Sequence, residues 1–407
     1  MISTIIIARW YGAEMMGIVA LLNSFLILAT IFTVLGTNTS ILRLVPEHLA
    51  KYSPSSAFKV YRKTQYFVVG VSLITGSILF FGSGFIAETI FSKPHLQFYF
   101  ALGALSIILK SLMDLNTQAV RGVRLIRTFA FMQLLPHLSM LVILVIITIF
   151  FFHQDNPIYA LFLSFAITAL AGVWIMDKVF KKKIAPKDPL QPMPIKDILS
   201  ISLPMLLTST MAFVIGRTGV IILGMFRPEA EVGYFAVAVK LSSLTLFAIS
   251  SVDSLAAPKF SELFHLGKME DIFHIAKKSA KLIFWTTTPL LLILLIFGRA
   301  IISLLFGHNF MVAYWAMVLL VIGRFVSSIS GSTAMFMNMT GHHKLFGNIM
   351  LIAAISNIIL NLIFIPQMGF YGAALAAMIC ISFYNITPLI YIKLKYGKTV
   401  GYLPVFG

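Results

Sequence analysis

The chain has few of the residues on which soluble enzymes depend. Its 407 residues include a single cysteine, Cys380, and only 14 aspartates and glutamates, and charged residues make up 11% of the total. One cysteine excludes an internal disulfide, and the nine histidines have none of the spacings typical of zinc sites. The sequence has no phosphate-binding loop and no dinucleotide fingerprint. It therefore predicts no metal site, no bound cofactor and no catalytic residues, and a protein that is not an enzyme.

Long apolar runs dominate what the chain does contain. Hydrophobic residues make up 59% of it, whereas a soluble domain has about a quarter of its residues charged. Most runs have the roughly 20 residues that cross a bilayer, and they must be helical because lipid cannot satisfy backbone polar groups. The sequence predicts an all-α integral membrane protein with about twelve spans: 1–8, 16–40, 64–90, 96–118, 129–152, 158–177, 198–224, 232–254, 282–305, 311–338, 346–366 and 371–392.

The first of these runs is too short to cross a membrane. Only eight residues precede Arg9, which corresponds to about 12 Å of helix. The run also lacks the basic start and the small-residue cleavage site of a secretory signal peptide. We therefore expect a truncated or mis-started amino terminus.

Most of the 31 Lys and Arg residues lie in connectors that fall on one predicted face of the membrane. The positive-inside rule then places both termini in the cytoplasm, for a multi-pass protein of the cell inner membrane. These loops, with their contacts to anionic membrane lipids, account for the net charge of +17, so no nucleic acid partner is needed. The basic connectors are 43–63, 121–127, 178–196, 259–281, Lys344 and the tail.

The two halves of the chain resemble each other at an offset of about 216 residues. The segment 12–17 introduces one span as 227–233 introduces another, and Phe81-Gly82 recurs as Phe297-Gly298. An even number of spans in each half gives both halves the same orientation, as in parallel repeats of transporters. We expect two six-helix lobes around a central cavity: an N-lobe at 1–180, a cytoplasmic linker at 181–197 and a C-lobe at 198–407.

Four cations, Lys110, Arg217, Lys240 and Arg324, lie inside apolar spans. Each costs about 2.5–3.5 kcal/mol at mid-bilayer depth, so each must pair, face a wet cavity or bind a ligand. Lys110 has Asp114 four residues on, and a local ion pair explains it as well as a substrate role does. The other three have no acid one turn away, so we predict that they contact an anionic substrate. Arginine suits phosphate because its planar fork donates two parallel hydrogen bonds.

Three further residues are weaker candidates. Arg43, at the inner end of the span 16–40, is either an interfacial anchor or a gate residue that meets phosphate. Asp114 and Asp253 are candidates for coupling to H⁺ or Na⁺, because intramembrane carboxylates often bind ions. Asp253 could instead be solvated at the inner end of its span, and Asp114 could simply neutralise Lys110.

Short motifs in this order resemble the polysaccharide flippases of the MOP superfamily, the Wzx-type exporters of O-antigen and teichoic acid. The resemblance covers essentially the whole chain. One departure is that Arg217-Thr218 precedes Gly219, where many relatives have an acid, so no role for that acid carries over. The segments that carry the resemblance are Ala8-Arg-Trp-Tyr-Gly-Ala-Glu-Met-Met-Gly17, Ile41-Leu-Arg-Leu-Val-Pro-Glu47, Ser202-Leu-Pro204, Leu223-Gly224, Glu231-Val-Gly-Tyr234 and Asn338-Met-Thr-Gly341.

The resemblance implies a lipid substrate with an anionic head group. That substrate would be a polyprenyl-diphosphate-linked oligosaccharide, moved from the inner to the outer leaflet by alternating access for cell-surface polysaccharide biosynthesis. The cations would receive the diphosphate, and an ion gradient or the membrane potential would drive transport. Other polysaccharide-assembly proteins are the implied partners.

Two other functions remain open at this point. A MATE-type cation or drug antiporter has the same architecture but needs acids in its cavity, whereas the buried charge here is mainly positive. A membrane glycan polymerase would need a sizeable extramembrane loop with catalytic groups, and the predicted outer connectors are short.

Overall fold

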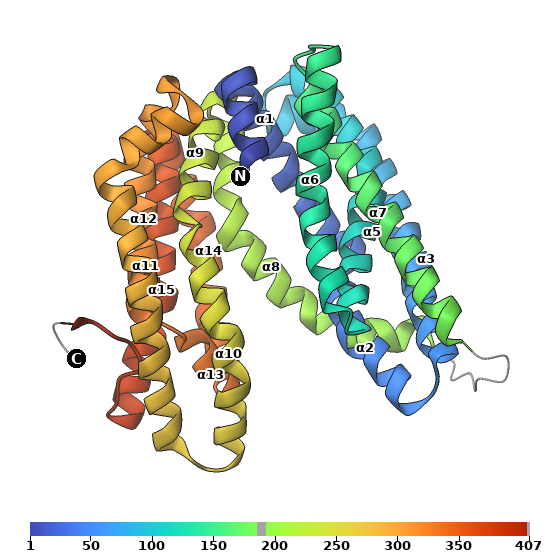
Figure 1. Cartoon of the computed structure of the whole chain (residues 1–407). Helices are drawn as coiled ribbons and strands as arrows, with labels where there is room; N and C mark the ends of the chain where they lie inside the picture. The colour runs from blue at the N-terminus through green and yellow to red at the C-terminus, as the bar shows by residue number, and fades with distance from the viewer. Residues whose placement is uncertain (185–192, 405–407) are drawn as a thin grey trace. The chain divides into compact units, whose positions relative to one another are not determined.

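The computed structural model describes residues 1–184 and 193–404, and all regular structure in these residues is helical (Figure 1). The central part of the predicted linker 181–197 lies outside the described residues. The longer helices are α1 (Ile2–Val34), α2 (Thr37–Lys51), α3 (Pro54–Phe81), α5 (Gln97–Gly122), α6 (Ile126–Phe150), α7 (Asn156–Lys183), α8 (Ile195–Phe226), α9 (Glu229–Ser242), α10 (Thr245–His265), α11 (Met269–Phe306), α12 (Tyr314–Ser330), α13 (Thr333–Met339), α14 (His343–Met368) and α15 (Phe370–Tyr396). Short turns of helix are α4 (Ser83–Phe85), η1 (Ile86–Ile90), η2 (Pro94–Leu96) and η3 (His308–Ala313).

Ten helices of the described residues are long and apolar enough to cross a membrane, or eleven if the pair α9 and α10 is one bent span. The expectation of about twelve spans is corrected in two places. The run 1–8 is the beginning of α1, which continues through a backbone irregularity at Gly12. The span at 232–254 is broken between Ser242 and Thr245, and its two halves meet at an angle of 43°.

The helices form two compact units. The N-unit consists of Ile2–Ile7 and Leu21–Phe213, and the C-unit consists of Met1, Ala8–Ala20 and Val214–Gly407. The chain passes between the units within continuous helices, because α1 and α8 each contribute residues to both.

The N-unit has a core of α3, α5 and α7 that combines ring packing with a few strong polar contacts. The buried Tyr61 ring lies near that of Phe180, and its hydroxyl donates to Asn116 Oδ1 at 2.9 Å. The guanidinium of Arg62 donates to both carboxylate oxygens of Asp177 at 2.6 Å, which links α3 to α7. Such bidentate contacts fix helix register as well as adding stability.

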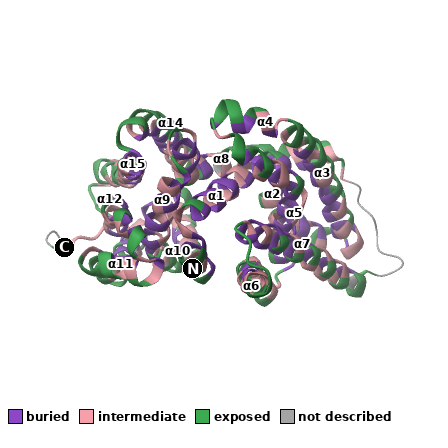
Figure 2. Cartoon of the chain, turned by 90° about the horizontal axis from the view of Figure 1, so that it is seen from above, coloured by how far each residue is buried: buried purple, intermediate pink, exposed green. Residues whose placement is uncertain are grey.

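The C-unit is built around α9. Figure 2 shows this helix largely in the colour of buried residues, with α12 and α15 beside it. Gly17 of α1 and Gly233 of α9 allow the two backbones to approach closely, since a Cβ at either position would collide with a backbone carbonyl of the other helix. Small residues commonly permit such approach between membrane helices.

Large apolar side chains cover the outside of both units. Phe81 at the end of α3 is 85% exposed, and Leu255 of α10 is 78% exposed. Exposure of this kind is expected where lipid rather than water is the solvent.

Candidate functional site

Arg324 is a cation whose guanidinium is only partly satisfied by the described residues. It lies in the middle of α12, and its Nε is buried without a hydrogen-bond partner among the described residues. The Tyr384 hydroxyl of α15 lies beside the guanidinium. The apolar run of α12 places Arg324 at membrane depth, where an unpaired N–H group is costly.

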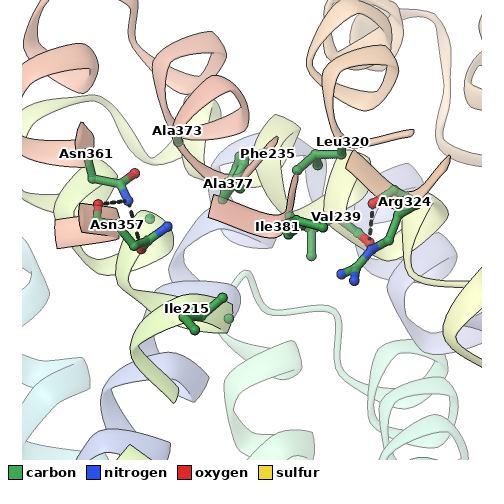
Figure 3. A pocket seen from close by; sticks show the side chains of 13 residues that line it. Ile215, Phe235, Val239, Leu320, Arg324, Asn357, Asn361, Ala373, Ala377 and Ile381 are labelled. Carbon is green, nitrogen blue, oxygen red and sulfur yellow. Dashed lines mark hydrogen bonds between the residues drawn. The ribbon is translucent and has the colours of Figure 1, made fainter. Parts of the chain in front are cut away.

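A small cavity of about 50 Å³ lies next to Arg324, within the C-unit (Figure 3). Residues of α8, α9, α12, α14 and α15 line it, and none of these described residues is acidic. The polar side chains in the wall are those of Arg324, Ser242, Asn357 and Asn361. The cavity is large enough for an ordered water or a small ion.

Asn357 and Asn361 form a polar pair on α14. The Asn361 amide donates to the Asn357 carbonyl oxygens, at 2.7 Å to the backbone and 3.0 Å to the side chain. This leaves Asn361 Oδ1 buried without a partner in the described part of the chain. Figure 3 shows the two amides together at the end of the cavity away from Arg324. The sequence analysis missed this pair, although two amides four residues apart in an apolar run are a detectable signal.

Arg217 and Lys240 lie close enough for their charges to repel each other. Both side chains are half-buried, and neither forms an ion pair or a side-chain hydrogen bond within residues 1–184 and 193–404. The helices that carry them, α8 and α9, also contribute Gly216 and Val239 to the wall of the cavity beside Arg324. The structure thus places three cations on helices α8, α9 and α12 of one unit, and none of them has a counter-ion among the described residues.

Lys110 and Asp114 form the ion pair that the sequence allowed. The Lys110 Nζ lies 2.6 Å from Asp114 Oδ1, and the ammonium also faces the ring of Phe165 at 5.6 Å. Lys110 is buried in α5 of the N-unit. It is therefore neutralised locally and is not grouped with the cations of the C-unit.

The two remaining candidates differ in exposure. The Arg43 side chain on α2 is 65% exposed, and its Nε lies 3.7 Å from Glu47 Oε2. Asp253 of α10 is half-buried, and its Oδ1 is enclosed without a hydrogen-bond partner in the described residues. Arg43 has the surroundings of an ordinary surface residue, whereas Asp253 does not.

Residues 6–315 match the family described as polysaccharide biosynthesis protein. Among individual relatives, a probable low-salt glycan biosynthesis flippase of Haloferax volcanii, Agl15, is 23% identical over 46% of this chain. An uncharacterized membrane protein of Methanocaldococcus jannaschii is 26% identical over 57% of this chain. The matches cover 40% and 47% of these proteins, so the chain spans less than half the length of the curated relatives it matches.

Two solved structures have the same fold over nearly the whole chain. The lipid II flippase MurJ, in an inward closed conformation, has a TM-score of 0.69 at 13% identity and covers 96% of this chain and 84% of its own. A multidrug resistance MATE family transporter of the MOP superfamily, in an inward-facing conformation, has a TM-score of 0.69 at 16% identity. The match covers 97% of this chain and 92% of the transporter. At these identities the likeness establishes the all-helical MOP fold.

Proposed function

We propose that this chain, which belongs to the polysaccharide biosynthesis protein family, is a flippase for a lipid-linked oligosaccharide. The family and the MOP fold make it a membrane protein of polysaccharide biosynthesis with the architecture of transporters. We propose further that the lipid anchor is a polyprenyl diphosphate and that the head group moves from the inner to the outer leaflet.

The observation that carries this proposal is the set of three cations without counter-ions in the C-unit. Arg217, Lys240 and Arg324 come from three helices that share a cavity wall, and no carboxylate of the described residues lies in that wall. A diphosphate supplies two or more negative charges and several acceptor oxygens. In a conformation of the transport cycle that opens the cavity of about 50 Å³, it would satisfy the unpartnered Arg324 Nε and screen the repulsion between Arg217 and Lys240.

The sign of this charge separates the two functions that the fold permits. A transporter of cationic drugs needs acids at its binding site, because desolvated cations bind where carboxylates compensate them. The described wall of the C-unit cavity offers an arginine, a serine and two amides instead. We therefore favour an anionic substrate over a cationic drug.

Transport would proceed by alternating access. Unpaired cations receive the diphosphate, the sugars follow it through hydrated parts of the protein, and the lipid tail stays in the bilayer. The low charge content of the spans keeps the tail in contact with apolar side chains. Within the described residues we infer no nucleotide-binding site, so an ion gradient or the membrane potential is proposed as the energy source.

Complementation tests the proposal in cells. Arg217→Ala, Lys240→Ala and Arg324→Ala would each be introduced into a strain that lacks its own flippase for lipid-linked oligosaccharide. We expect loss of surface polysaccharide in each case, with Lys277→Ala, which removes an exposed cation of the same unit, as the control. Full function of the Arg217, Lys240 and Arg324 variants would contradict the cationic site.

Binding to the purified protein tests the head-group chemistry directly. We expect undecaprenyl diphosphate to bind Arg324→Ala about tenfold or more weakly than the parent, because hydrogen bonds to charged groups contribute about 1.5–3 kcal/mol. Undecaprenol, which has the same lipid chain but no phosphate, should bind the parent and Arg324→Ala equally. Equal affinity of the two proteins for the diphosphate would exclude Arg324 from its recognition.

A further inference from the structure

Asp253 is a carboxylate that is not fully hydrogen-bonded by the described residues around it. It lies in the middle of α10, eight residues after the helix begins. Its Oδ1 is buried and has no hydrogen-bond partner among residues 1–184 and 193–404. The Ser332 hydroxyl lies beside the carboxylate, and the Ser332 Oγ is likewise buried and without a standard hydrogen bond in the described chain. Asp253 and Ser332 therefore lie near each other, and each has a buried oxygen without a hydrogen-bond partner in the described chain.

Ser332 belongs to a break between two helices. The helix α12 ends at Ser330 and α13 begins at Thr333, and Gly331 between them has a φ of 59°. A side chain at Gly331 would strike Ala280 of α11, so the break is held tightly against its neighbour. The ends of the two helices at such a break leave backbone groups without helical partners.

Among the described residues, Asp253 has no basic partner. It takes part in no ion pair in the described chain, and only burial and Ser332 act on its carboxylate. The basic residues of α10 and α11 have other contacts: Lys259 pairs with Glu262, and Lys281 lies over the Tyr402 ring. Arg299 lies over the Tyr314 ring, and His265 contacts the Ser261 carbonyl oxygen. Lys277 and Lys278, also on α11, are exposed. The helix α13 contributes no titratable side chain.

A row of serine hydroxyls lies along α10 on either side of Asp253. Ser250, Ser251 and Ser254 of α10 are exposed although they lie in a membrane-length segment, and all three donate to backbone carbonyls of their own helix. Ser254 follows Asp253 directly, and Ser250 precedes it by about one turn. Hydroxyls bonded in this way leave their oxygen lone pairs for water.

We propose that Asp253 is a proton-binding site of the C-unit, where the protonated carboxyl pairs with Ser332 at the break between α12 and α13. A proton delivered by water along the serine row forms an O–H bond at the unpartnered Oδ1, which donates to the Ser332 oxygen. When the proton leaves, Asp253 is again a carboxylate, and the Ser332 hydroxyl can donate a hydrogen bond to it. Protonation thus changes the contact that α10 makes with the break. The coupling of this step to transport rests on the proposed flippase function, whereas the proton binding does not.

Infrared difference spectroscopy of the purified chain without substrate tests the proton binding. Lowering the pH from about 8 to about 5 should produce a band of protonated carboxyl that shifts in heavy water, and Asp253→Asn should lose it. Asp271→Asn, which removes an exposed carboxylate at the start of α11, should keep it. Ser332→Ala should shift the band without removing it, which preserves the test if Asp253→Asn misfolds. Spectra of the parent and Asp253→Asn that agree at every pH would overturn the proposal.

Transport in proteoliposomes tests the coupling separately. A gradient of one pH unit is a tenfold ratio of proton concentration, so it can shift the distribution of a substrate coupled to one proton about tenfold. We expect the parent to move lipid-linked oligosaccharide faster under this gradient and Asp253→Asn to lose the acceleration while still binding the lipid. Retained acceleration in Asp253→Asn would exclude Asp253 as the coupling site. A carboxyl band in a protein that moves no lipid would leave the proton site standing and reject the flippase function.

Discussion

Gly17 of α1 and Gly233 of α9 lie against each other, with the backbone of each helix occupying the space where the other residue's side chain would be. These two residues are also separated by 216 positions, the offset of the internal repeat. The repeated Gly-containing segments are therefore more than a trace of duplication. They form a tight contact inside the C-unit, to which Ala8–Ala20 of α1 belongs.

Replacing either glycine by alanine should destabilise the C-unit. A Cβ at Gly17 would collide with the Glu229 carbonyl, and a Cβ at Gly233 would collide with the Ala13 carbonyl. The backbone of a helix cannot move aside as the end of a flexible side chain can. We therefore expect the free energy of unfolding to fall by about 1–3 kcal/mol. Thermal unfolding in detergent would measure it, with Gly347→Ala as the control. That site on α14 has open space, and alanine should there be neutral or stabilising by up to about 1 kcal/mol.

The sequence predicted the helical membrane fold and the family, and both are confirmed. Interior spans were accurate because apolar runs determine them: 96–118 became α5 at Gln97–Gly122, and 346–366 became α14 at His343–Met368. The errors lie where packing rather than composition decides. Hydropathy does not register that α1 continues through Gly12, or that the span at 232–254 bends after Ser242.

The candidate site was predictable to a similar extent. Buried cations are conspicuous in an apolar sequence, so Arg217, Lys240 and Arg324 could be selected by charge alone. The polar partners are harder to select: the spacing of Asn357 and Asn361 in an apolar run is a signal, but Ser332 becomes significant only when its oxygen is found buried and unpaired in the described chain. That Arg324 lines a cavity, with Arg217 and Lys240 on two other helices that contribute to its wall, depends on tertiary packing, which no local pattern reports.

Replacing only Lys110 of the Lys110–Asp114 pair should destabilise the protein far more than replacing both residues. Lys110→Met leaves an unpaired carboxylate in α5, and we expect it to cost about 3–5 kcal/mol in thermal unfolding. The double variant Lys110→Met with Asp114→Leu replaces the pair with apolar groups and should recover most of this stability. Recovery of polysaccharide export along with stability would assign the pair a structural role. A stable but inactive double variant would show that Lys110 or Asp114 takes part in transport.

A carboxylate at Gly219 should weaken anion binding. Gly219 and Arg324 line the same cavity, and a Cβ at Gly219 would lie 3.3 Å from Asn361 Oδ1. Gly219→Asp would place a negative charge in a wall that has none among its described residues. We expect it to lower the affinity for undecaprenyl diphosphate by about tenfold, because the repulsion between two nearby negative charges in a protein is large enough to weaken binding by this factor or more. Gly219→Asn has nearly the same shape and should bind within a few-fold of the parent. Equal losses in the two variants would point to steric crowding instead of charge.

The stability of the C-unit should depend on pH through His342, which lies between α13 and α14. Burial lowers the pKa of the His342 imidazole, and the ammonium of Lys395 lowers it further. The Lys395 Nζ lies 2.7 Å from Nε2, so the neutral ring accepts this hydrogen bond. A histidine whose pKa is lower in the folded state than in the unfolded one favours unfolding once protons bind. Its contribution is complete above the unfolded pKa of about 6.5 and is lost as the pH falls through the folded value.

We therefore expect the melting temperature of the purified chain to fall as the pH is lowered below about 6.5. His342→Asn, whose amide can still accept from Lys395, should flatten this dependence because it cannot take up the proton. His343→Asn removes the exposed neighbouring histidine and should leave the slope unchanged. Since Lys395 and Tyr396 both belong to the end of α15, the slope reports whether this end stays docked on the turn at His342. If the melting temperature of His342→Asn depends on pH as that of the parent does, another group causes the acid sensitivity. The contact between Lys395 and His342 would then not contribute to it.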